Sequence, residues 1–232
     1  MACVLSKFPP FVMCVTLALL LPGACGCNIV GAVAAKTLPN DVPPKYVGLQ
    51  NQAVAVMVWA DRAVRVDWNR IQLDAAAAIQ NDLHALAGSG GNPSKELLGI
   101  QFPLQPAQIA RFQKDRPFLE TAPVTEFAPE LPVTRLIYVE LEQFSTRSDI
   151  APQLYRGTAV ATLKVVEIDP ATNAARVAYE ENGIRAGFPR QGREEGEIAG
   201  NDQVFYVETI RALAAEVANR FVTHEAPMGE GQ

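Results

Sequence analysis

Three segments decide the fold: VTRLIYVELEQF (133–144), YRGTAVATLKVVEID (155–169) and AARVAYEE (174–181). Apolar and polar residues alternate in each of them, which is typical of β-strands with one buried face. The side chains that we expect to face the core are Val133, Ile137, Val139, Leu141, Ala159, Ala161, Leu163, Val165, Ala175, Val177 and Tyr179. The turn-forming sequence DPATN (169–173) separates the last two segments, so the pattern predicts an antiparallel three-strand meander.

The residues around this meander predict one further strand and two long helices. Residues 53–59 (AVAVMVW) are apolar on both faces, as in a strand that is covered on both sides. Apolar residues recur at helical spacing in Asp67–Leu86 and again in Asp202–Val222. This order predicts an α+β (mixed α/β) fold, with a single mixed sheet and helices packed mainly on one face.

The sequence also predicts where the helices start and what the connecting segments form. Asp67 is a suitable N-cap for the first helix, and Asn201 or Asp202 for the last one. Within Glu96–Thr134, Leu97–Leu104 is consistent with a strand and Pro106–Lys114 with a short helix, whereas four prolines interrupt the remainder. The five glycines and mixed charges of 183–200 predict an exposed loop.

The N-terminal residues have the features of an export signal. Lys7 precedes an apolar run, FVMCVTLALLL (11–21), and small residues follow the run. A helix of this length spans only about 16 Å, roughly half of the ~30 Å hydrocarbon core. The segment therefore predicts a cleaved secretory signal rather than a transmembrane anchor.

All four cysteines lie in the first 27 residues, which excludes a disulfide framework for the rest of the chain. The cysteines after small residues, in LPGACGC (21–27), resemble the lipobox of bacterial lipoproteins. In that class the cysteine at the cleavage site carries the lipid, here Cys25 or alternatively Cys27. Ala24-Cys25-Gly26 also fits an ordinary signal-peptidase site, so secretion without lipid stays open.

We therefore predict four regions along the chain. They are a signal peptide (1–24), a lipid-anchored linker rich in Pro and Gly (25–52), a single α+β domain (53–224) and a frayed tail (225–232). Hydrophobic residues make up 49% of the chain, which supports a packed core, and the formal net charge of −5 argues against nucleic-acid binding.

Familiar catalytic and metal-binding patterns are not apparent. The chain has two histidines, His84 on the first helix and His224 after the last one, and their positions do not predict a catalytic triad or a His-rich metal site. The run Gly88-Ser89-Gly90-Gly91 follows a helix, so it fits a helix end rather than a phosphate loop or a nucleophile elbow. We expect no cofactor and no metal.

The outward side of the predicted meander is the strongest candidate for an interaction surface. Alternation places Tyr138, Glu140, Glu142, Lys164 and Arg176 on that side, and these are the proposed partner-binding residues. Trp59 and Trp68 flank the first strand–helix connection, where they either pack in the core or form an aromatic clamp for a ligand.

The order of the segments resembles a group of periplasmic lipoproteins. VAVMVWADR (54–62), an alanine-rich helix, LIYVELEQFSTR (136–147), LYRG (154–157) and a final amphipathic helix are similar to the curli-secretion, penicillin-binding-protein-activator and TolB N-terminal type of domain. The resemblance implies a non-enzymatic domain that docks with protein partners or supports an export or envelope machine. Pore-forming strands are not evident here, so the resemblance does not imply pore formation.

These observations predict a lipid-anchored cell-envelope protein, placed outside the cytoplasm, on the outer membrane and facing the periplasm. We expect it to be non-catalytic and to bind an envelope protein partner or assist envelope assembly or transport. The alternative is a secreted or anchored hydrolase whose site lies in loops 96–132 or 183–200.

Overall fold

The computed structural model describes residues 41–88, 93–189 and 200–225. The chain divides into two units, and the elements that form the sheet and its covering layers all belong to the unit Val42–His224. Two short strands, β1 (Asp41–Val42) and β6 (His224–Glu225), pair as a separate two-stranded sheet. The predicted signal peptide, both candidate lipid sites Cys25 and Cys27, and most of the tail lie outside the described residues.

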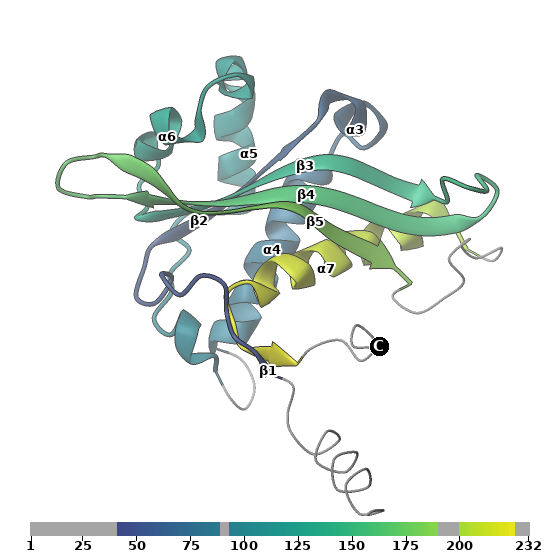
Figure 1. Ribbon diagram of the computed structural model, residues 1–232. Coiled ribbons are helices and arrows are strands. Elements are labelled where there is room, and N and C mark those ends of the chain that lie inside the picture. Colours follow the sequence, from purple (N-terminus) through teal and green to yellow (C-terminus); the bar gives the residue numbers. More distant parts are fainter. Residues whose placement is uncertain (1–40, 89–92, 190–199, 226–232) are drawn as a thin grey trace, which may run out of the picture. The chain divides into compact units, whose positions relative to one another are not determined.

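A four-stranded sheet forms the centre of the unit, in the order β2–β3–β4–β5 (Figure 1). β3 (Arg135–Arg147), β4 (Tyr155–Ile168) and β5 (Ala175–Phe188) form an antiparallel meander, and β2 (Val54–Ala60) pairs in parallel with β3. The predicted α+β class and the meander are confirmed. The register of β3 and β4 follows from alternation, because Ile137, Val139 and Leu141 of β3 and Ala159, Ala161, Leu163 and Val165 of β4 are all buried.

The third strand differs from its prediction in two ways. Its pairing with β4 shifts register at Ala178, so Tyr179 packs against the core on one face of the sheet while Ala175 packs against the core on the other. The expected shared inward face of Ala175, Val177 and Tyr179 is therefore wrong, and Val177 is 39% exposed. The strand also continues through a second bulge at Gly183, where φ is +71°, to Phe188, into the segment predicted as a loop.

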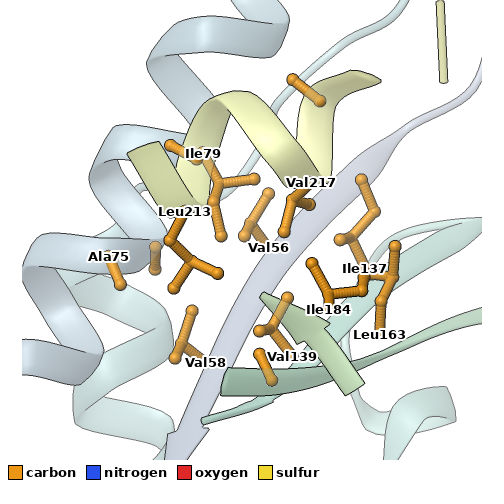
Figure 2. Close-up of a cluster of buried hydrophobic side chains, with 14 of the residues drawn as sticks. Val56, Val58, Ala75, Ile79, Ile137, Val139, Leu163, Ile184, Leu213 and Val217 are labelled. Atoms are coloured by element: carbon orange, nitrogen blue, oxygen red, sulfur yellow. The ribbon is translucent and has the colours of Figure 1, made fainter. Parts of the chain in front are cut away.

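Two long helices cover one face of the sheet. α4 (Ile71–Gly88) and α7 (Asp202–Asn219) lie side by side below it, and we call this side the helix face (Figure 1). Their apolar stripes meet the alternating strand residues in one core, which includes Val56, Ile79, Val139, Leu163 and Leu213 (Figure 2). The burial of α7 follows the predicted spacing, because Ile210, Ala214, Val217 and Phe221 are all buried.

Two local contacts fix the start of α7 and its distance from the sheet. The side chain of Asn201 accepts a hydrogen bond from the Val204 amide at 2.9 Å, which confirms one of the two predicted caps. α7 also lies so close to β4 that a Cβ atom at Gly157 would sit 1.7 Å from Thr209 Oγ1. The glycine of the LYRG sequence therefore allows the close approach of helix and sheet.

The predicted helix Asp67–Leu86 is wrong at its start. A short helix, α3 (Arg62–Asp67), ends at Asp67, and α4 begins at Ile71. Trp68, between them, adopts a non-helical backbone with φ −132° and ψ 77°. Its ring stacks on Tyr206 with 5.0 Å between centroids and contacts Phe144 edge-on, so tertiary packing of this ring accompanies the break in the helix.

Short helical segments cover part of the opposite face, which we call the upper face. These are α5 (Pro106–Lys114), α6 (Val124–Phe127) and the 3-10 turns η2 (Pro117–Glu120) and η3 (Ala128–Glu130). α5 confirms its predicted bounds. The segments enclose a second core that includes Ile109, Leu119, Phe127 and Leu131 above β2 and β3. Residues 105–131 are therefore a packed layer, where the sequence suggested mainly broken structure.

Two other segments complete the unit. The predicted strand Leu97–Leu104 is wrong: η1 (Lys95–Leu97) is a 3-10 turn, and only Gln101 bridges to Ala53 beside β2. Pro103 has no amide hydrogen, which prevents the pairing from extending there. The packed body also includes part of the segment assigned to the linker, because Leu49 is buried and the Lys45 amide donates to the Arg220 carbonyl at 2.8 Å.

Candidate functional site

The upper face of the sheet is covered only in part, and its remaining half carries polar side chains. α5 and α6 lie over β2 and over the adjoining ends of β3, β4 and β5, where Leu136, Val166 and Ala175 pack in the second core, while the other ends of these three strands are not covered by α5 or α6 (Figure 1). Register and alternation assign a set of residues to this bare area, which we call the open face. It comprises Glu140, Glu142, Gln143, Thr158, Val160, Thr162, Lys164, Glu180, Asn182 and Arg185.

Lys164 is the central charge of the open face. Its Nζ lies 2.9 Å from Glu140 Oε1 and 3.1 Å from Glu140 Oε2, so β3 and β4 are joined by a two-point contact. On the other side, Glu180 lies directly opposite Lys164 in the register, with its Oε1 3.9 Å from Nζ. The Lys164 side chain is only 20% exposed, which holds the ammonium group between the two carboxylates.

A second group of polar side chains lies next to this triplet. The Thr162 hydroxyl is 2.7 Å from Glu142 Oε1 and 3.1 Å from Asn182 Oδ1, and Thr162 itself is buried. Glu142 is the extra residue of a bulge in β3, between the pairs at Leu141 and Gln143. A residue from each of three strands is thereby fixed across the sheet, which gives the open face an ordered arrangement of charges.

Two of the five predicted partner-binding residues do not belong to this surface. Tyr138 is only 5% exposed because the segment 105–131 covers it, and its ring meets Phe127 edge-on with 6.0 Å between centroids. Burial, together with the charge of Glu140, raises the pKa of the Tyr138 hydroxyl. Arg176 lies on the helix face, where it pairs with Glu167. Glu140, Glu142 and Lys164 do come together, as predicted.

Sequence reasoning missed three members of the open face, Gln143, Asn182 and Arg185. Gln143 follows the bulge at Glu142, which reverses the side given by simple alternation, and Asn182 and Arg185 lie beyond the predicted strand 174–181. Alternation had placed Glu180 on the correct side. Thr162 was placed on the correct side but was not linked to Glu142. The register between β4 and β5 would have found Asn182 and Arg185, since Arg185 lies opposite Val160 and Asn182 contacts Thr162.

The helix face carries a charged network at the far edge of β5. Glu181 accepts from Lys45 at 2.7 Å, lies 3.3 Å from Arg220 Nε, and is hydrogen-bonded by Tyr179. Burial alone would raise the pKa of this carboxyl, but these three partners outweigh it and lower the pKa of Glu181 to about 2. The network joins the segment before β2 to β5 and α7.

A hollow of about 550 Å³ lies between the first turns of α4 and α7. Trp68 and Tyr206 line it, and the Tyr206 hydroxyl donates to Asp74 Oδ2 at 2.9 Å. Burial and this hydrogen bond raise the pKa of Tyr206. Trp68 packs against the core of the helix face and Trp59 against that of the upper face, so the two rings do not form a clamp.

The remaining candidates are separated from each other. His84 lies on α4 near Phe102, whereas His224 is in β6. Among residues 41–88, 93–189 and 200–225, no group of three or more His, Cys, Asp or Glu side chains is placed to hold a metal ion. Within the same ranges, no helix is long and apolar enough to span a bilayer.

Comparison with known proteins gives structural matches only. No family model matches the chain, and no curated protein matches it in sequence. Solved structures that are similar include a PelC dodecamer from Paraburkholderia phytofirmans, with a TM-score of 0.38 and 10% identity over 78% of this chain and 96% of that chain.

Two further structures match to a similar degree. The lipoprotein GNA1162 from Neisseria meningitidis has a TM-score of 0.37 and 11% identity, over 72% of this chain and 98% of that chain. The hypothetical protein CT253 from Chlamydia trachomatis has a TM-score of 0.35 and 19% identity, over 73% and 98% respectively. Likenesses of this degree do not establish a function, and the predicted resemblance to the curli-secretion type of domain stays a prediction.

Proposed function

We propose that this chain is an exported, lipid-anchored protein of the cell envelope whose folded body binds a protein partner through the open face. The proposal rests on the difference between the two halves of the upper face. One half of the upper face is sealed by a packed layer, while the other half presents charges that are held in place across three strands.

The arrangement of these charges suits recognition of another protein surface. Antiparallel sheets often have one solvated face, but here the charged groups are fixed by mutual contacts, so fewer side chains must be ordered when a partner binds. Glu140, Glu142 and Glu180 outnumber Lys164 and Arg185. The proposed partner therefore has a basic contact surface, which places positive groups against the carboxylates.

The location follows from the N-terminal sequence. A signal peptide that ends before Cys25 would leave that thiol to carry lipid, and multiple acyl chains give stable attachment because each buried methylene contributes about 0.8 kcal/mol. In this proposal the protein is held on the outer membrane and faces the periplasm, with Cys27 as the alternative lipid site.

The proposed role is non-catalytic: binding of a partner, or assistance to envelope assembly or transport. The mutual hydrogen bonds of the open face, between Glu140 and Lys164 and between Glu142 and Thr162, support a binding role.

Lipid attachment is tested by metabolic labelling with radioactive palmitate. We expect label in the wild-type protein and its loss in Cys25→Ala, with Cys27→Ala as the matched control that retains label. Loss in Cys27→Ala alone would move the lipid site to Cys27. Label that persists in the double variant would contradict attachment at either cysteine.

Partner binding is tested by mild cross-linking in intact envelopes, followed by affinity isolation. Glu142→Lys and Glu180→Lys each replace a carboxylate of the open face by a cation, and we expect each to reduce capture of a basic partner strongly. Glu208→Lys is the control, because Glu208 is on α7 and pairs with Arg211 on the other side of the sheet. Equal loss of capture in Glu208→Lys would rule out the open face as the contact surface.

A further inference from the structure

A small cavity lies beside the covered half of the upper face, between α3, the start of α4 and α5. Its volume is about 310 Å³, and its lining includes Trp59, Arg65, Gln72, Gln113 and Lys114. The cavity is separate from the open face and has no part in the proposed function. Its size is at the lower end of the range for small-ligand sites.

Arg65 is the feature of this cavity that most needs explanation. Its Nη2 donates to Glu120 Oε1 at 2.6 Å, and its Cζ lies 5.2 Å from the centre of the Trp59 ring. Its Nε is buried and has no hydrogen-bond partner, and in the described part of the chain no other buried side-chain nitrogen or oxygen lacks one. Buried donors of this kind are nearly always paired, with water or an ion where the protein supplies no acceptor.

The other lining groups set the charge and shape of the cavity. Lys114 is exposed at its rim, and no carboxylate in residues 41–88, 93–189 or 200–225 pairs with it. Gln72 and Gln113 are held in place, since the Nε2 atoms of both donate to the Val58 carbonyl, at 3.2 Å and 2.9 Å. Two cations against the single carboxylate of Glu120 leave one positive charge in excess.

We propose that this cavity binds a carboxylate group, which pairs with the Arg65 guanidinium and is neutralised by Lys114. A guanidinium presents Nε and Nη donors in a planar fork that matches the two oxygens of a carboxylate. The excess of one positive charge matches a monoanion, whereas a phosphate dianion would leave the site negative. The carboxylate belongs either to a free small acid or to an acidic side chain of a protein.

The two tryptophans allow binding to be followed in the full-length protein. The indole N–H signals of Trp59 and Trp68 are recorded by ¹⁵N NMR and assigned with Trp59→Phe and Trp68→Phe. Because Trp59 lines the cavity and Trp68 packs on the helix face, a bound carboxylate should move the Trp59 signal and leave the Trp68 signal in place. The probes are sodium acetate and the peptide N-acetyl-Gly-Glu-Gly-amide.

We expect a saturable shift of Trp59 with both probes, and none with sodium chloride at the same ionic strength. Tighter binding of acetate would identify a free acid as the source of the carboxylate, and tighter binding of the peptide an acidic side chain. An equal shift with chloride, or a shift that does not saturate, would overturn the proposal.

Three variants then locate the contact. Arg65→Lys keeps the charge but removes Nε, so we expect binding to weaken by about tenfold, and Lys114→Gln should weaken it less. Glu120→Gln removes the competing internal carboxylate and should tighten binding severalfold. Lys95→Gln is the matched control, because Lys95 is also exposed but lies in η1, away from the cavity. An unmoved Trp68 signal verifies that each variant is folded, and wild-type affinity in Arg65→Lys would disprove the assignment.

Discussion

The helix face and the upper face of the same sheet are covered in different ways. On the helix face, α4 and α7, with 18 residues each, bury the central residues of β2, β3 and β4 and the end of β5. On the upper face, the layer consists of segments of 3 to 9 residues and stops halfway across the sheet. Alternate residues of each strand face the two sides of the sheet, so one strand can have one side buried and the other exposed. How much of each side is buried therefore depends on the segments that connect the strands.

This difference has an energetic consequence. A long amphipathic helix presents several turns to one core, and its removal exposes all of them together. The short segments of the upper layer are held by fewer buried side chains, with a proline at or near the start of several of them. We therefore expect the helix face to dominate global stability, and the upper layer to open at lower free energy.

The largest effect is expected at Phe221, which is fully buried just after α7 and meets the ring of Tyr46 edge-on. Phe221→Ala should lower the free energy of unfolding by about 4 kcal/mol, because it removes the ring and leaves a cavity. Urea denaturation followed by circular dichroism measures this change. A loss below about 1 kcal/mol would show that the end of α7 does not pack as described.

Phe127 gives the corresponding test on the upper face. It is the last residue of α6, is 2% exposed and meets the ring of Tyr138 edge-on. Phe127→Ala should cost about 3 kcal/mol, less than Phe221→Ala, because a layer of short segments can collapse into the space that the ring leaves. Native-state hydrogen exchange should show faster exchange in residues 105–131 than in α7. Equal acceleration in both would mean that the two layers unfold as one unit.

The network at Glu181 is expected to contribute less, and its contribution depends on pH. The folded-state pKa is lowered to about 2, so the stabilisation is fully present above the ordinary carboxyl value and is lost as the pH falls toward 2. Glu181→Gln should therefore cost about 1–2 kcal/mol at pH 7, and the difference from wild type should disappear near pH 2. The adjacent Glu180→Gln, on the open face, is the control and should show a smaller loss of stability at pH 7.

The strands and the long helices were predictable because their burial is periodic. Val139 and Leu163, or Ile210 and Val217, repeat at the spacing of a strand or a helix, whatever they pack against. The break at Trp68 was not predictable, since the residues on both sides favour helix and the ring's partners, Phe144 and Tyr206, are distant in sequence.

The candidate site shows the same limit. Glu140 and Lys164 were placed together correctly because they belong to the regular parts of β3 and β4. Glu142 was also placed correctly, because the alternation of β3 is interrupted only at this residue and not before it. Tyr138 lies on the predicted side of the sheet, but its burial was not predicted, because residues 105–131, which cover it, contain prolines and show no clear helical or strand period. Arg176 was misplaced because one extra residue, Ala178, moves it to the other side of the sheet, and a bulge leaves no clear mark in a single sequence.

The smallest effect is expected on the open face itself, in a double-mutant cycle of Glu140→Gln and Lys164→Met. The two side chains are 37% and 20% exposed and form a cross-strand pair, so their coupling energy should be about 0.5 kcal/mol and should fall in high salt. Chemical denaturation of the wild type, both single variants and the double variant gives this value. A coupling above about 2 kcal/mol would mean that these charges hold the sheet together. A small coupling, combined with loss of partner capture in the charge-reversed variants, would separate the face that stabilises the protein from the face that is available for binding.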